Sequence, residues 1–222
     1  MSRLTRRVQI DDPKYDDDER NGQNGGGEEE GGGATKLRST SSNVSDDQEP
    51  FMGVKVRRKA SLHREVKGDY IDVPSHPRLM KILQKQGDKH ILFADKVLKF
   101  TASGKMKRRI LLITDFAIYI LDPENDVLKR RIAMAAVEKL CLSELSDNFL
   151  AIIIPTEYDL LMASTRKTEI VTVLVEHTKS SSNYELDVEF SNSIEYQAAA
   201  DLTKEVQFEE VEGGVRTRIL RK

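Results

Sequence analysis

The chain has little of what indicates a disulfide-bonded, membrane-spanning or aromatic-rich protein. It contains one cysteine, Cys141, and no tryptophan, and aromatic residues make up 6% of its 222 residues. One cysteine cannot form an intrachain disulfide, and no segment reads as a secretory signal, so we expect a cytosolic or nuclear protein. No apolar run approaches the roughly 18 residues that span a bilayer. Any membrane contact should therefore be peripheral, at the cytoplasmic face.

The chain also lacks a strong excess of charge of either sign. Its formal net charge is −2 and its isoelectric point is near 6.2, which argues against bulk nucleic-acid binding. The charge is unevenly distributed, because residues 1–55 carry 8 basic and 12 acidic side chains and the remainder carries 27 and 25. Seven of the 13 glycines lie between Gly22 and Gly33. Residues 1–55 are thus predicted to be a disordered, acidic, Gly/Ser-rich head.

Residues 56–92 are predicted to be a basic linker with a short helix. Arg57, Arg58 and Lys59 precede Ser61 in a pattern that basophilic kinases favour. A phosphate on Ser61 would add negative charge to a basic segment and weaken its attraction to an anionic surface. Farther along, Pro77 is expected to start a helix that ends near Gly87 and packs on the following domain.

Residues 93–222 are predicted to form a mostly β domain. Seven short strand-like runs follow one another, at residues 95–100, 109–114, 116–122, 127–132, 137–143, 149–155 and 158–163. Their close spacing suggests a small antiparallel barrel or sandwich. Residues 165–178 then read as an amphipathic helix, with Ile170, Val173 and Leu174 on one face. Residues 204–210 and 215–219, joined through Gly213 and Gly214, read as an additional C-terminal hairpin.

The most informative stretch is the basic hairpin of the first two runs. From Lys96 to Arg109 it has six basic residues and no acidic one. The candidate lipid-binding residues are Lys99, Lys105, Lys107, Arg108 and Arg109. Residues two apart on a strand share a face, so Lys107 and Arg109 should point together, with Lys99 across from them. Backbone N–H groups of Ser103 and Gly104 are expected to approach an anion in the loop.

Further basic residues are candidates for an accessory surface. They are Arg57, Arg58, Lys59, Lys129, Arg130 and Arg131. The alternative reading of all these cations is a solvated strand edge protected against aggregation.

No catalytic or metal-binding set is recognisable. His63, His76, His90 and His177 are scattered without metal-ligand spacing, and there is no nucleophile-elbow motif. Cys141 lies in an apolar run and is expected to be a buried core residue. We therefore predict a protein that is not an enzyme and needs neither a metal nor another cofactor.

Several segments, taken in order, resemble the tail homology 1 (TH1) domain of class I myosins. They lie at residues 67–71, 94–99, 109–115, 128–132, 145–150, 166–174, 190–196 and 213–217. The resemblance covers roughly residues 58–222 and implies a pleckstrin-homology-like barrel with a helix after the seventh strand. In that family a strand lysine and a basic-x-Arg triplet bind acidic phospholipids, and Lys99, Lys107 and Arg109 match these positions. A nucleotide-binding P-loop and a motor domain are not found in this sequence.

The resemblance implies a peripheral membrane-binding module for acidic phospholipids, and phosphoinositides are the expected ligands. The alternative is a protein-interaction adaptor of the actin and myosin cytoskeleton, because pleckstrin-homology-like scaffolds also bind peptides and proteins. Fold alone does not decide between the two.

Overall fold

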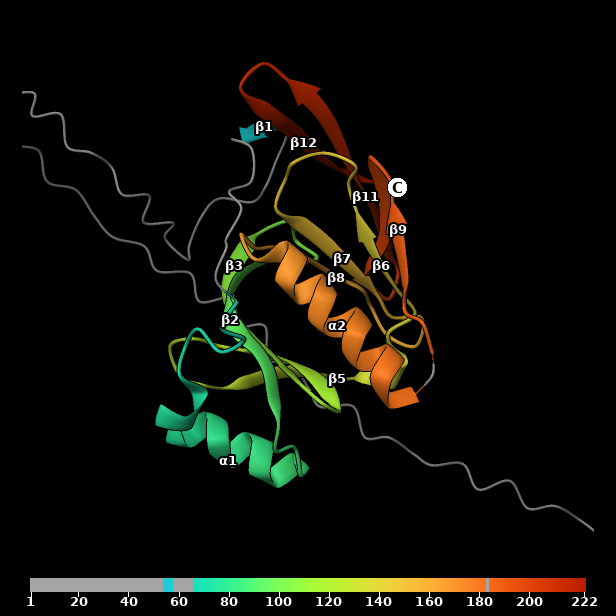
Figure 1. Cartoon of the computed structure of the whole chain (residues 1–222). Helices are drawn as coiled ribbons and strands as arrows, with labels where there is room; N and C mark the ends of the chain where they lie inside the picture. Colours follow the sequence, from blue (N-terminus) through green and yellow to red (C-terminus); the bar gives the residue numbers. More distant parts are fainter. Residues whose placement is uncertain (1–53, 58–65, 183) are drawn as a thin grey trace, which may run out of the picture. The chain divides into compact units, whose positions relative to one another are not determined.

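A computed structural model describes residues 54–57, 66–182 and 184–222 (Figure 1). All of these residues belong to one unit of the chain, residues 43–222. Residues 1–53 of the predicted disordered head lie outside the described residues, as do Arg58, Lys59, Ser61 and His63 of the predicted linker. The last two residues of the predicted head, Val54 and Lys55, lie in a strand instead, so the prediction of disorder is wrong for them. The proposed division at residues 55/56 and 92/93 stays a prediction.

The seven predicted barrel strands are present in the predicted order. They are β2 (Ile91–Phe100), β3 (Met106–Thr114), β4 (Ala117–Leu121), β5 (Leu128–Ala133), β6 (Lys139–Leu142), β7 (Phe149–Ile153) and β8 (Leu160–Ala163). They belong to a sheet of order β5-β4-β3-β2-β8-β7-β6-β9, in which β2 contacts both β3 and β8. Strand β2 thus joins the two halves of the sheet, and their inner side chains meet in one core.

Helix α2 (Lys167–Ser182) follows β8 and covers that core. Ile170 and Leu174 are fully buried against inner residues such as Phe93 and Leu150, as the helical spacing predicts. Figure 1 shows α2 running across the strands on the side away from helix α1 (Pro77–Gln86). A mostly β barrel with a helix after its seventh strand is therefore confirmed.

Helix α1 packs on the outer face of the sheet. Pro77 is its first residue, and Gly87 ends it in a left-handed conformation with φ 82°. Both limits agree with the predicted ones. Leu79 and Leu83 are buried against outer-face residues of β2 and β3, among them Ala94. The prediction that this helix packs on the following domain is confirmed.

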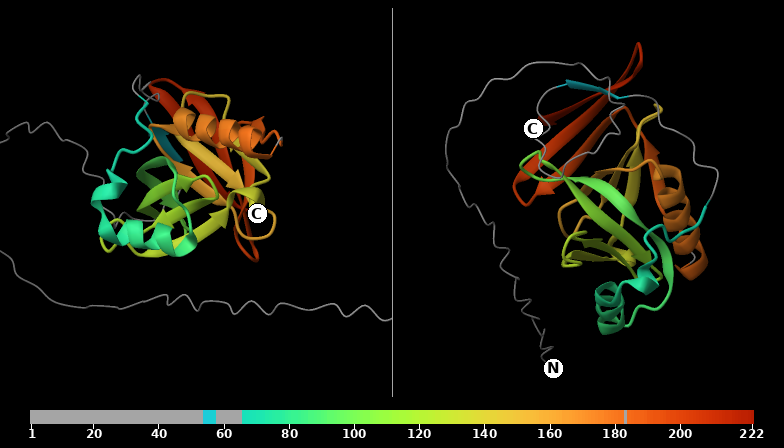
Figure 2. Two further views of the ribbon diagram at one scale, coloured as in Figure 1. Left: turned by 60° about the horizontal axis from the view of Figure 1, so that its bottom comes forward. Right: turned by 90° about the vertical axis from the view of Figure 1, so that its left-hand side faces the viewer.

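The C-terminal region forms more than the expected hairpin. Strand β9 (Asp187–Phe190) pairs in parallel with β6 and extends the large sheet. The predicted hairpin is β11 (Leu202–Val211) with β12 (Gly214–Arg221), and it lies in a four-stranded sheet between β10 (Ser193–Ala199) and β1 (Val54–Arg57). Figure 2 shows this sheet beside the barrel strands. A second core joins the two, with Phe149 stacked on Phe100 at 5.1 Å and edge-on to Phe208 at 5.3 Å.

Candidate anion-binding site

Strand alternation places three of the predicted cations on the inner face of the barrel. Val97 is an inner core residue, and Lys99 lies two residues farther along β2 on the same face. In the antiparallel register Lys99 is opposite Lys107, and Val97 is opposite Arg109. All three therefore lie just beyond the apolar core, at the hairpin end of the barrel.

Arg130 of β5 is the fourth member of this inner cluster, since Ile132, two residues on, belongs to the inner core. Its side chain is only 4% exposed. The guanidinium stacks 3.9 Å from the Tyr158 ring centre, its Nη2 lies 2.9 Å from a Glu157 carboxylate oxygen, and Nη2 also donates to the Tyr158 carbonyl. Its Nη1 is buried and has no hydrogen-bond partner among the described residues. A buried charged donor of this kind is what an anion would satisfy.

The electrostatics of Lys99 show that these cations are close together. The pKa of the Lys99 ammonium is lowered from its ordinary 10.5 to about 8, chiefly by burial and then by the charges of Arg130, Arg109 and Lys107 in that order. Its Nζ also lies 5.6 Å from the Tyr158 ring centre, so one ring contacts two cations. Desolvation and like charge both disfavour the ammonium, and an anion at this position would relieve the second effect.

Acidic residues balance only part of the cluster. Asp122 lies 3.3 Å from Arg109 and 3.9 Å from the exposed Lys129. Glu157 pairs with Arg130. Lys99 and Lys107 have no ion pair within the described part of the chain that meets a 4.0 Å limit. The positive excess is therefore concentrated on the β2–β3 strands.

A hollow of about 360 Å³ opens beside Lys99. Its walls include Tyr158, Asp159 and the residues Ala198–Ala200 at the end of β10 and the start of the turn to β11. The small alanine side chains leave room for a headgroup-sized ligand against a half-buried lysine. The C-terminal extension thus contributes a wall to this hollow, in which Lys99 is the member of the inner cluster that lines it.

The hairpin loop is closed by its own hydrogen bonds. The Thr101 N–H donates to the Lys105 carbonyl at 2.9 Å, and the Gly104 N–H donates to the Thr101 carbonyl at 2.9 Å. Gly104 has φ 87°, which explains a glycine at this turn. The expectation that the Gly104 N–H approaches an anion is wrong, because the turn already uses this donor. Lys105 is exposed beside it.

Two predicted residues lie on the outer face instead. Arg108 is opposite Leu98, which alternates with the inner residues Val97 and Lys99. Arg131 lies near the end of α1, where its Nε donates to the Tyr119 hydroxyl at 3.0 Å and its Nη2 is 3.6 Å from the buried Asp88, just after the helix. The structure therefore does not bring Arg108 and Arg131 together with the inner cluster.

The two remaining accessory residues that the structure describes, Arg57 and Lys129, do not extend the inner cluster. Arg57 lies in β1, whose pairing alone is described, and Lys129 is exposed on β5. Tyr158, Glu157 and Asp122 were not anticipated, although Tyr158 organises both Lys99 and Arg130. They lie in turns between strands, although Asp122 and Tyr158 are end residues of the predicted runs 116–122 and 158–163. A strand pattern does not indicate a role for a residue just beyond the end of the strand.

Other chemistry is not evident in the part of the chain that the structure describes. It contains no group of three or more His, Cys, Asp and Glu side chains placed to hold a metal ion. Cys141 is buried as predicted, and burial raises the pKa of its thiol to about 11. None of the described helices is long and apolar enough to cross a membrane.

Comparisons with known proteins agree on one family. A family model described as "Unconventional myosin tail, actin- and lipid-binding" matches residues 57–220. Myosin heavy chain IB of Acanthamoeba castellanii is 34% identical over 164 residues, which cover 70% of this chain and 14% of that protein. Myosin IB heavy chain of Dictyostelium discoideum is 31% identical over 169 residues, covering 73% of this chain and 15% of that protein. The chain therefore spans only a small part of the length of these relatives.

A solved structure, the hSac2 domain from human phosphoinositide phosphatase Sac2, is a more distant likeness. It has a TM-score of 0.38 and 12% sequence identity, and the match covers 52% of this chain and 90% of that structure. At that level the likeness supports no argument about function.

Proposed function

The chain belongs to the unconventional-myosin tail family, the TH1 domain, and from that premise we propose that it is a peripheral membrane-binding module for acidic phospholipids. The family description names lipid and actin as ligands. The proposed activity is binding without catalysis, at the cytoplasmic face of a membrane. Phosphoinositides are the proposed preferred lipids, because several phosphates on one rigid ring match several converging cations.

One observation carries the proposal, namely the inner cluster of Lys99, Lys107, Arg109 and Arg130. Three strands contribute to it, and the pKa of Lys99 is lowered first by burial and then by the other three charges. Arg130 Nη1 is a buried donor without a hydrogen-bond partner among the described residues. Holding like charges together destabilises the free protein, and a polyanionic headgroup reverses this effect.

Residues outside this cluster would act through long-range attraction. Lys105 and Lys129 are exposed, and each basic residue near an anionic leaflet contributes about 1 kcal/mol. We propose the same role for the segment of Arg57, Arg58 and Lys59, with phosphorylation of Ser61 weakening it.

Vesicle co-sedimentation tests the proposal. Vesicles would contain phosphatidylcholine alone, added phosphatidylserine, or added phosphatidylinositol bisphosphate at matched total charge. Lys99→Ala/Arg109→Ala should bind acidic vesicles about 30-fold more weakly, since two contacts of about 1 kcal/mol each are lost. The matched control is Lys81→Ala/Lys85→Ala, which removes two exposed charges from α1 and should change binding far less.

The two variants also separate specific from diffuse attraction. Tighter binding to the phosphoinositide vesicles at equal charge, lost only in the inner-cluster variant, supports headgroup recognition. Equal losses in both variants, or no binding to any acidic vesicle, would sink the lipid proposal.

The second candidate function is a cytoskeletal adaptor that binds actin. Besides the family description, an apolar groove of about 630 Å³ favours it, at the end of the barrel where α2 finishes. Phe116 and Tyr184 line this groove and are 58% and 50% exposed. Exposed aromatic side chains around a groove are typical of protein contacts. Co-sedimentation with actin filaments, compared with Phe116→Ala/Tyr184→Ala, tests this candidate; equal pelleting of both proteins would remove the groove from consideration.

A further inference from the structure

The turn between β7 and β8, residues 154–159, holds Arg130 of the inner cluster by several contacts at once. Arg130 Nε donates to a Glu157 carboxylate oxygen at 3.0 Å, and Nη2 pairs with the same oxygen and donates to the Tyr158 carbonyl. The Tyr158 ring covers the guanidinium at 3.9 Å. Nη1 has no hydrogen-bond partner in the described part of the chain. The turn therefore fixes the orientation of the guanidinium and leaves one of its nitrogens for a ligand.

The same aromatic ring also contacts Lys99. Lys99 Nζ lies 5.6 Å from the Tyr158 ring centre, on a side chain that otherwise has like charges around it. A ring attracts cations through its face, so Tyr158 offsets part of the repulsion between Lys99 and Arg130. Long basic side chains without such a contact turn their charged ends toward water. Tyr158 thus holds two cations from two strands in place before a headgroup binds.

Asp159 attaches this turn to the C-terminal sheet. Its carboxylate accepts hydrogen bonds from the Ile154 N–H at 2.7 Å and from the Gln197 N–H of β10 at 2.6 Å. The Asp159 N–H donates to the Gln197 carbonyl at 2.7 Å. Asp159 is buried, and hydrogen bonds from backbone N–H groups to a carboxylate are strong where water is excluded. Because Tyr158 directly precedes Asp159, its place depends on β10.

Gln197 also orders the opposite wall of the hollow beside Lys99. Its Nε2 donates to the carbonyls of Ala199 at 3.0 Å and Ala200 at 2.8 Å. Both alanines line the hollow, as does Tyr158. One residue of β10 therefore connects the two walls, through its backbone on one side and its amide on the other.

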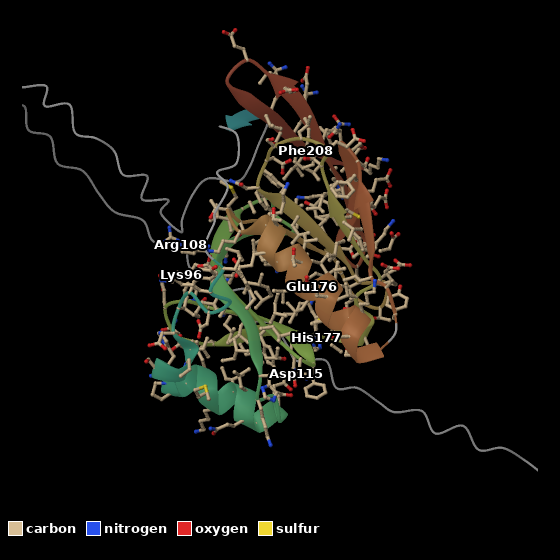
Figure 3. The ribbon with its side chains drawn as sticks, in the orientation of Figure 1. Lys96, Arg108, Asp115, Glu176, His177 and Phe208 are labelled. Carbon is tan, nitrogen blue, oxygen red and sulfur yellow. The ribbon has the colours of Figure 1, made fainter. Side chains whose placement is uncertain are left out.

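Packing of the second core places the C-terminal sheet at this end of the barrel. Phe100, which follows Lys99 on β2, is buried in one cluster with Phe149 and Phe208. Figure 3 shows Phe208 toward the top of the molecule and Asp115, in the turn between β3 and β4, toward the bottom. The sheet thus supports the barrel at the hairpin end, and α2 finishes near the other end.

We propose that Tyr158 is a positioning residue of the headgroup site and that the C-terminal sheet holds it in place through Asp159 and Gln197. The proposal rests on the proposed membrane-binding function and gives the sheet a part in headgroup affinity. A site whose cations are held before binding loses less conformational entropy when the ligand arrives. Changes in β10, which carries no cation of the inner cluster, should therefore alter binding.

Calorimetric titration with soluble inositol trisphosphate tests the role of the ring. Tyr158→Leu keeps an apolar side chain but lacks the aromatic face, and it should bind about tenfold more weakly than the wild type. Tyr158→Phe keeps the face and should bind within about twofold of the wild type. Unchanged affinity of Tyr158→Leu, or an equal loss in both variants, would overturn this role.

A second pair of variants tests the role of the sheet. Gln197→Met removes the amide contacts to Ala199 and Ala200 and should weaken binding about threefold. The matched control is Gln207→Met on the neighbouring strand β11, where the amide donates to Glu205 instead, and its affinity should not change. Thermal unfolding of all the variants accompanies the titrations, because a purely structural role would lower Tm and leave the affinity of the folded protein unchanged.

The outcomes separate this proposal from the function on which it rests. If Tyr158→Leu and Gln197→Met bind like the wild type while Lys99→Ala/Arg109→Ala loses binding, the inner cluster keeps its role and the positioning proposal is wrong. If the wild-type chain binds neither inositol trisphosphate nor any acidic vesicle, the proposed function fails, and the positioning proposal fails with it.

Discussion

Arg130 and Arg131 are adjacent in the sequence, yet they belong to two different regions of the molecule. Arg130 points into the barrel end, where three other cations lie nearby and one of its own donors lacks a partner among the described residues. Arg131 points to the outer face and pairs with the buried Asp88, which directly follows the end of α1. The inner face thus concentrates uncompensated charge, whereas the outer face at Arg131 uses charge to attach a helix. Consecutive basic residues of a strand therefore point to two opposite surfaces, and strand alternation indicates which of them share a surface.

The largest expected effect is a loss of stability when the hydrogen-bond network of the outer face is broken. Asp88 accepts hydrogen bonds from the Thr114 and Tyr119 hydroxyls and pairs with Arg131. Asp88→Ala leaves the buried Tyr119 hydroxyl without its acceptor, removes one of two acceptors of the Thr114 hydroxyl and unpairs Arg131, and it should lower the free energy of unfolding by about 3 kcal/mol. Urea unfolding measures this. Inositol trisphosphate should bind the folded variant normally, and weaker binding at unchanged stability would contradict the division between the faces.

The second effect contrasts the two neighbouring arginines. Arg130→Gln removes a charged donor of the inner cluster and should weaken inositol trisphosphate binding on the order of tenfold. Arg131→Gln is the matched control, with the same substitution one position away. It should leave that affinity unchanged and lower the free energy of unfolding by about 1 kcal/mol. Calorimetry and urea unfolding would be carried out on both variants. Weaker ligand binding by Arg131→Gln, with Arg130→Gln unaffected, would contradict the prediction.

The third effect is a pH dependence of the inner cluster. Because the pKa of Lys99 is about 8 in the free protein, headgroup affinity should fall as pH rises above about 8, by at most about tenfold per pH unit. Below pH 8 the ammonium is already charged, so the affinity should be nearly flat down to the range where the phosphates take up protons. Lys99→Met should bind more weakly and lose the dependence above pH 8. A wild-type affinity that stays constant from pH 7 to 9 would contradict the assignment.

The lowered pKa of Lys99 affects stability in the opposite direction: headgroup affinity falls with pH, whereas the free energy of unfolding rises. The folded pKa lies below the ordinary 10.5, so the unfolded chain binds more protons between pH 8 and 10.5. The free energy of unfolding contributed by Lys99 should therefore increase with pH across that window. Urea unfolding of the wild type and of Lys99→Met, compared at both ends of the window, isolates this contribution.

The smallest expected effect concerns the exposed loop. Lys105 contacts no inner-cluster residue through a described hydrogen bond or ion pair of its side chain, and it lies in the solvent-exposed turn. Lys105→Ala should weaken binding to phosphatidylserine vesicles by at most about fivefold at low salt. High salt should abolish the difference. Any change in binding of soluble inositol trisphosphate would show that Lys105 belongs to the inner site.

Much of this arrangement could be predicted from the sequence because it follows strand and helix periodicity. The seven strands, α1 between Pro77 and Gly87, and the face shared by Lys99, Lys107 and Arg109 all rest on local patterns. The role of Arg130 could not be predicted, because its burial depends on Tyr158 from a distant turn. The pairing of β10 and β1 with the C-terminal hairpin likewise depends on contacts far apart in the chain. Local periodicity determines which way a side chain points, and tertiary packing decides what it meets.

The central claim, that the inner cluster binds a polyanionic headgroup, is tested most directly by nuclear magnetic resonance of the arginine side chains. Inositol trisphosphate would be titrated into the wild-type chain while the Nε–H signals of Arg109, Arg130 and Arg131 are followed. We predict saturable shifts for Arg109 and Arg130 and none for Arg131, whose guanidinium faces Asp88. Signals of Arg109 and Arg130 that stay in place while the ligand binds elsewhere would contradict the account.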